Sequence, residues 1–69
     1  MNYRELSRKL LALNCLLDRQ AKGSHEIWRN SLTGSKTTIP NWAGKDLKPG
    51  TISRILRDLD IPKNKFDEV

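Results

Sequence analysis

The sequence of 69 residues contains a single cysteine, Cys15, and a single histidine, His25. One thiol cannot form an internal disulfide, so the disulfide frameworks of small secreted proteins are excluded. A second histidine, a cysteine pair and carboxylates at ligand spacing are also missing, so we predict neither a metal site nor a cofactor. Cys15 lies in the apolar segment Leu-Asn-Cys-Leu-Leu, and we interpret it as a packing residue.

Long apolar runs are absent as well. No window approaches the ~20 apolar residues of a membrane span. The first residues, Met1 to Glu5, lack the apolar stretch of a signal peptide. We therefore expect a cytoplasmic protein that has no contact with a membrane. A chain of this length predicts one domain over residues 1–69, with room for one sheet packed on one or two helices.

Charged residues, in contrast, are abundant and unbalanced. Lys and Arg number 13 against 8 Asp and Glu, which gives a net charge of +5 and an isoelectric point of about 9.8. Small domains with this balance usually meet a polyanion such as nucleic acid. The basic residues are concentrated between Lys22 and Lys48, whereas acidic residues gather near the C-terminus.

Hydrophobic spacing predicts the first helix and the strands. Leu6, Leu10 and Leu13 recur at intervals of four and three, which indicates an amphipathic helix at about residues 3–13 that ends near Asn14. Turn residues then separate short segments of β-propensity. We expect strands at about residues 16–20, 25–29 and 36–39.

The second half of the sequence predicts an ordered loop over residues 41–48, followed by a helix. That helix spans about residues 49–59, and Pro49 fits its first turn. Its buried stripe is Ile52, Ile55, Leu56 and Leu59. A tail, 60–69, follows. The order α-β-β-β-α predicts an α+β fold like that of double-stranded RNA-binding domains, with two helices on one face of a three-stranded antiparallel sheet.

Three motifs give the chain a family resemblance. Residues 22–29 read Lys-Gly-Ser-His-Glu-Ile-Trp-Arg, residues 38–40 read Thr-Ile-Pro, and residues 44–51 read Gly-Lys-Asp-Leu-Lys-Pro-Gly-Thr. In this order and spacing, over about residues 4–60, the chain resembles the HicA family of bacterial mRNA interferases. The resemblance implies cleavage of RNA by the histidine of Gly-Ser-His, here His25, and neutralisation by a HicB-type antitoxin.

Two departures from the family pattern stand out. The family usually has a glycine and an aromatic residue after the first helix, where this chain has Asn14 and Cys15. Asparagine tolerates the left-handed backbone of such a position, so we expect the geometry to be kept. After the Thr-Ile-Pro strand, relatives often carry another histidine, where this chain has Trp42. Neither departure touches His25.

The chemistry of RNA cleavage fits a histidine. Cleavage without a metal needs a base for the 2′-hydroxyl, an acid for the 5′ oxygen, and cations for the charge on the phosphate. Histidine titrates near cellular pH and suits either proton transfer. We therefore predict that His25 is the base or the acid. The other proton carrier stays open, a bound water included, and Lys22, Lys36 and Lys45 are candidates for stabilising the phosphate.

Basic and aromatic side chains around His25 predict an RNA-binding surface. Trp42 lies in a polar loop and is a candidate for stacking on bases, whereas Trp28 lies within a strand and is interpreted as a core residue. Strand alternation places His25 and Arg29 on one face and Glu26 and Trp28 on the other. The predicted RNA-binding set is Lys22, Gly23, Ser24, Arg29, Lys36, Trp42, Lys45 and Lys48, with Arg19 as a further candidate.

Two other classes of function stay open. The first is a non-catalytic RNA-binding domain of the same fold, which a cleavage assay distinguishes from a nuclease. The second is a DNA-binding module that uses the second helix for recognition. Pro-Gly at the start of that helix, and the strands that precede it, argue against a helix-turn-helix.

Overall fold

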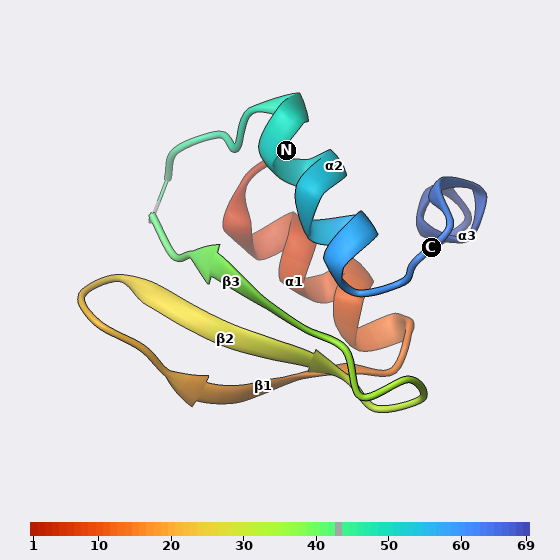
Figure 1. Cartoon of the computed structure of the whole chain (residues 1–69). Coiled ribbons are helices and arrows are strands. Elements are labelled where there is room, and N and C mark those ends of the chain that lie inside the picture. Colours follow the sequence, from red (N-terminus) through yellow and green to blue (C-terminus); the bar gives the residue numbers. More distant parts are fainter. Residues whose placement is uncertain (43) are drawn as a thin grey trace.

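The computed structural model describes residues 1–42 and 44–69 (Figure 1). The strands form an antiparallel sheet in the order β1-β2-β3. Helices α1 and α2 lie on the same face of that sheet (Figure 1), so the predicted α+β fold is confirmed. The elements are α1 Tyr3–Ala12, β1 Cys15–Gln20, β2 His25–Asn30, β3 Lys36–Pro40, α2 Pro49–Asp58 and α3 Lys63–Asp67.

The ends of α1 follow from its flanking residues. The side chain of Asn2 accepts a hydrogen bond from the backbone N–H of Glu5 at 2.9 Å, which satisfies a donor of the first turn. After the helix, Asn14 has a φ of 68°, the left-handed conformation expected for it. The chain turns there and enters β1, so α1 is slightly shorter than the 3–13 that the leucine spacing predicts.

Helix α2 begins at Pro49, where a missing N–H costs no helical hydrogen bond. The tail adds the short helix α3, which buries Phe66 against the core. No helix within residues 1–42 and 44–69 has the length and apolarity needed to cross a membrane.

The core lies between the helices and one face of the sheet. Cys15 is fully buried in it, as expected of a packing residue, and burial raises the pKa of its thiol. Trp28 is also buried, which agrees with its interpretation as a core residue. The core consists of Leu6, Leu10, Cys15, Trp28, Ile39, Leu47, Ile55, Leu56, Leu59, Ile61 and Phe66.

The segment between β3 and α2 is tied to the N-terminus of the chain. The backbone N–H of Leu47 donates to the carbonyl oxygen of Met1 at 2.7 Å, and Asn2 forms an isolated β-bridge with Asp46. The terminal ammonium group lies 3.7 Å from the Asp46 carboxylate. These contacts hold residues 45–47 beside the start of α1. Residue 43 of the predicted loop lies outside the described residues.

Candidate active site

His25 is the first residue of β2, and a tight turn presents it to solvent. Within that turn, Ala21 N–H donates to the His25 carbonyl at 2.9 Å, and His25 N–H donates to the Lys22 carbonyl at 3.3 Å. Gly23 has a φ of 66°, which glycine adopts without a steric penalty. The amide of Gln20 donates to the carbonyl oxygens of Gly23 and His25 at 3.3 and 3.1 Å. The Gly-Ser-His turn is therefore held by backbone and side-chain hydrogen bonds.

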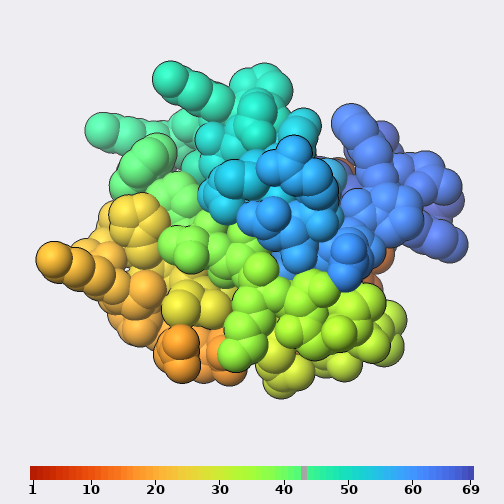
Figure 2. Space-filling model, viewed as in Figure 1, coloured from red at the N-terminus to blue at the C-terminus, as the bar shows by residue number. Residues whose placement is uncertain are grey.

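The end of β3 lies next to this turn. His25 pairs with Pro40, and the N–H of Asn41 donates to the Ser24 carbonyl at 2.8 Å, which continues the pairing past the strand. Trp42 follows and is 46% exposed. We call residues 20–25, 40–42 and 44–48 the hairpin end of the molecule. Figure 2 shows side chains of the turn and of the segment before α2 projecting at this same end, on the left.

His25 lies on the face of the sheet that the helices leave uncovered, in line with Ile27 and Arg29 along β2. Cross-strand partners share a face, so Arg19 and Thr38 lie on either side of Ile27 there. Among residues 1–42 and 44–69, none forms a hydrogen bond with the imidazole of His25. His25 is exposed to solvent. We name this surface the open face; its members are Leu16, Arg19, His25, Ile27, Arg29, Lys36 and Thr38.

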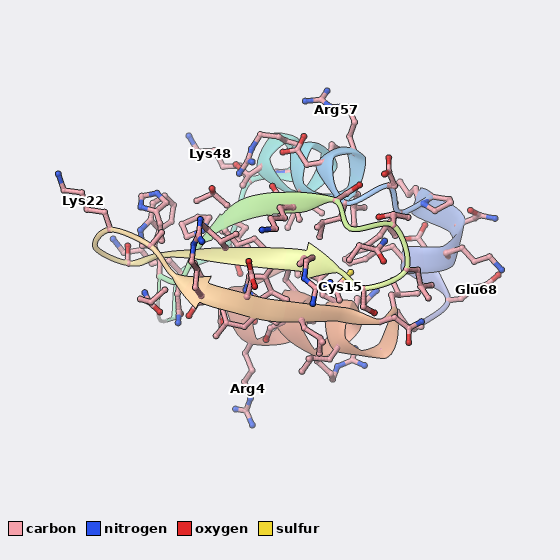
Figure 3. The ribbon with its side chains drawn as sticks, turned by 60° about the horizontal axis from the view of Figure 1, so that its bottom comes forward. Arg4, Cys15, Lys22, Lys48, Arg57 and Glu68 are labelled. Atoms are coloured by element: carbon pink, nitrogen blue, oxygen red, sulfur yellow. The ribbon has the colours of Figure 1, made fainter. Side chains whose placement is uncertain are left out.

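The predicted cations divide into two groups. Lys22, Lys45 and Lys48 are exposed at the hairpin end, and Figure 3 shows Lys22 and Lys48 at the end of the molecule opposite Glu68. The N–H of Lys45 donates to the Trp42 carbonyl at 3.2 Å, which keeps this lysine next to the tryptophan. The structure thus gathers Lys22, Gly23, Ser24, His25, Trp42, Lys45 and Lys48 at one end.

Arg29 and Lys36 lie away from this group. They are register partners on the open face, four residues along β2 from His25, which is about 13 Å for an extended strand. Lys36 also forms an ion pair with Asp18 at 3.3 Å. Its charge is therefore partly balanced before any ligand arrives.

A buried carboxylate on the other face was not predicted as part of the site. Glu26 is only 6% exposed and accepts three hydrogen bonds. The donors are Tyr3 Oη at 2.5 Å, Trp28 Nε1 at 3.2 Å and Asn41 Nδ2 at 3.2 Å. Burial, followed by the hydrogen bond to Glu26, raises the pKa of Tyr3 to about 12. The available sequence signal was the alternation that places Glu26 on the same face as Trp28.

Possible metal ligands do not gather in the described part of the chain. No group of three or more His, Cys, Asp or Glu side chains lies together among residues 1–42 and 44–69.

Comparison with known families decides what kind of protein carries this site. The family model described as the HicA toxin of bacterial toxin–antitoxin systems matches residues 3–61. The chain belongs to the HicA toxin family. As a member of this family, the chain is a toxin of a toxin–antitoxin system. Comparison with curated proteins gives no match, and comparison with solved structures gives none either.

Proposed function

We propose that this HicA-family toxin is an endoribonuclease that cleaves mRNA in the cytoplasm and uses His25 for proton transfer. One observation carries the proposal: the single histidine of the chain stands exposed in the Gly-Ser-His motif, at the end of the molecule that also holds Lys22, Lys45 and Lys48. A histidine in a structural role is usually buried and hydrogen-bonded through its ring. The imidazole of His25 has neither property among the described residues.

The proposed reaction is transesterification within the RNA strand. The 2′-oxygen attacks the adjacent phosphorus, and the bond from phosphorus to the 5′ oxygen breaks. The products are a 2′,3′-cyclic phosphate and a 5′-hydroxyl. His25 removes the 2′-hydroxyl proton or delivers a proton to the leaving oxygen. A bound water or a lysine supplies the other transfer.

Cations at the hairpin end supply the charge stabilisation. Lys22 and Lys45 lie on the two segments that meet at Ser24 and Asn41, and both are exposed. Either ammonium group can neutralise the charge that builds on the phosphate. Lys36 is the weaker candidate, because Asp18 already pairs with it and it lies on β3 opposite Arg29, at the end of the sheet away from His25.

The remaining predicted residues bind the RNA strand. Trp42 is half-exposed at the hairpin end, and its indole can stack on an unpaired base. Lys48 contacts phosphate there, and Arg29 and Lys36 extend the basic track along the open face. Gly23 and Ser24 shape the turn and allow close approach of the backbone. Binding therefore weakens steeply as salt rises.

A HicB-type antitoxin is the proposed protein partner. The helices leave the open face uncovered, and this face mixes Leu16, which is 47% exposed, with the basic residues. Mixed apolar and cationic surface of this kind fits a protein that carries apolar and acidic side chains. We expect the bound antitoxin to exclude RNA from His25, so the complex binds RNA poorly and does not cleave it.

The test of the function is incubation of the purified toxin with an end-labelled single-stranded RNA in EDTA. We expect cleavage, with 2′,3′-cyclic phosphate ends, and no cleavage of an RNA whose 2′-hydroxyls are all replaced by hydrogen. Cleavage that needs a divalent ion would contradict the metal-independent mechanism. Binding without cleavage would favour the alternative, a non-catalytic RNA-binding domain of the same fold.

A further inference from the structure

A polar cavity of about 370 Å³ opens at the hairpin end, between the start of α1 and the segment that follows β3. It is lined by Asn2, Tyr3, Arg4, Asn41 and Gly44. The backbone of Asn41 is bonded to Ser24, the residue before His25. The cavity therefore adjoins the turn that carries the proposed catalytic histidine.

The carboxylate of Glu26 controls the side chains that line this cavity. Tyr3 and Asn41 both donate to it, and it is buried behind them. A carboxylate has only acceptor oxygens, so Asn41 has to turn its amide nitrogen toward Glu26. The contact is 3.2 Å, from Asn41 Nδ2 to Glu26 Oε2. Glu26 thereby determines that the nitrogen of the Asn41 amide is used within the protein, and that the oxygen is free to bind a ligand.

The atom of the Asn41 amide that does not contact Glu26 is the carbonyl oxygen, Oδ1. No described residue donates a hydrogen bond to it, and Asn41 is exposed at the wall of the cavity. Because Glu26 holds the nitrogen, Oδ1 is the polar atom of this amide that stays available to a ligand in the cavity. Arg4 also lines the cavity, and its guanidinium projects into solvent (Figure 3). Its charge favours the approach of an RNA phosphate.

We propose that this cavity is a base subsite for the RNA substrate, and that it selects a base with an amine at the N4 or N6 position, namely cytosine or adenine, over a base with a carbonyl oxygen at that position. The inference rests on the proposed endoribonuclease function. An amine at cytosine N4 or adenine N6 donates to Asn41 Oδ1. Uracil and hypoxanthine carry a carbonyl oxygen at the corresponding position, which leaves two acceptors facing each other. Two acceptors in contact repel each other and displace the water that each would otherwise bind, so we expect discrimination of about tenfold.

The same logic predicts that Glu26→Gln reverses the preference. Glutamine keeps one oxygen for Tyr3 and Trp28 and presents an N–H₂ group where Asn41 was bonded. The Asn41 amide then rotates by half a turn and accepts from the new donor. Its nitrogen faces the cavity, which now favours the carbonyl of uracil or hypoxanthine.

The experiment measures binding and cleavage of short labelled RNAs that differ at one position, cytidine against uridine or adenosine against inosine. Binding is measured on the His25→Ala protein, so that the RNA stays intact. Glu26→Gln and Asn41→Ala are each compared with Glu68→Gln, a charge-matched change at the other end of the molecule (Figure 3). We expect the protein without a further change, and the Glu68→Gln variant, to prefer the amine-bearing base at one position of the RNA. The Glu26→Gln variant should reverse this preference, and the Asn41→Ala variant should abolish it.

The outcomes separate the two proposals. The subsite is refuted, and the nuclease stands, if the toxin cleaves RNA but does not distinguish cytidine from uridine or adenosine from inosine. The same conclusion follows if Glu26→Gln keeps the original preference. If no RNA is cleaved, the nuclease is refuted, and the binding preference still tests the subsite. If Glu26→Gln does not fold, Asn41→Ala decides: a preference that survives in this variant overturns the inference.

Discussion

Alternate residues of β2 have different partners. Glu26, Trp28 and Asn30 point toward the helices, and all three are buried. His25 and Arg29 point away from the helices and remain accessible to solvent. One strand of six residues therefore contributes both to the core and to the proposed active site.

The polar groups of the covered face are all satisfied, which shows how a small domain tolerates them. Glu26 accepts three hydrogen bonds, and Asn30 donates to the Leu59 carbonyl at 2.7 Å while accepting from Leu32 N–H at 2.9 Å. Across the described residues, no buried side-chain nitrogen or oxygen lacks a partner. Removal of a hydrogen-bonding side chain from the covered face should therefore lower stability, whereas removal of a side chain from the open face should lower activity with little change in stability.

The largest loss of stability is expected from Trp28→Ala. Trp28 is 3% exposed in the core and also bonds Glu26, so truncation leaves a cavity and removes a donor. We expect the free energy of unfolding to fall by about 3–5 kcal/mol, as measured by urea denaturation. The matched change Trp42→Ala, at a half-exposed position, should alter it by less than about 0.5 kcal/mol. Equal losses in the two variants would show that the core position of Trp28 carries no extra stability over the half-exposed position of Trp42.

Asn30→Ala is expected to have the next largest effect. It leaves the Leu59 carbonyl and the Leu32 N–H without their side-chain partner. Unsatisfied buried groups cost about 1–3 kcal/mol. Thermal unfolding should show the loss as a lower Tm, while RNA cleavage per folded molecule should stay at the wild-type rate. A wild-type Tm would show that the hydrogen bonds of Asn30 add nothing to stability.

Tyr3→Phe tests the same network through pH. The pKa of Tyr3 is raised from 10.0 to about 12 in the folded protein, so the folded state holds this proton more tightly than the unfolded state. The stabilisation is complete below pH 10 and is lost as the pH rises through 12. The stability advantage of the wild type over Tyr3→Phe should shrink across this window in denaturation curves. A constant difference would show that Tyr3 does not titrate with a raised pKa.

The smallest stability change is expected on the open face. Arg29→Ala should alter the free energy of unfolding by less than about 0.5 kcal/mol, yet it should weaken RNA binding. Loss of one phosphate contact should also reduce the slope of log affinity against log salt by about 1. Arg57→Ala, on the solvent side of α2 (Figure 3), provides the control and should leave the slope unchanged. The same slope in both variants would remove Arg29 from the RNA-binding surface.

Sequence reasoning predicted the fold because its signals are local. Leucine and isoleucine spacing gave the two main helices, and Asn14 and Pro49 marked the boundaries where the structure places them. The alternation of β2 was also visible, but periodicity alone did not say which face is buried. That choice depends on α1 and α2, which pack on the side of Trp28.

Other features depend on residues far apart in the sequence. The Glu26 cluster joins α1, β2 and the segment after β3, and no local pattern links Tyr3 with Asn41. The pair between Lys36 and Asp18 joins the two edge strands. The sequence analysis treated Lys36 and Lys22 as equal candidates for stabilising the phosphate. The strand register places Lys36 opposite Arg29, at the end of the sheet away from Lys22.

The most direct test of the central claim compares RNA cleavage by the wild type and by His25→Ala in EDTA. The imidazole has no hydrogen bond among the described residues, so the variant should fold with unchanged stability and bind RNA nearly as well. We expect its cleavage rate to fall by about 10²–10⁴-fold, the range that general acid–base catalysis contributes. Cleavage by His25→Ala at the wild-type rate would contradict the role of the open face as a catalytic surface built on His25.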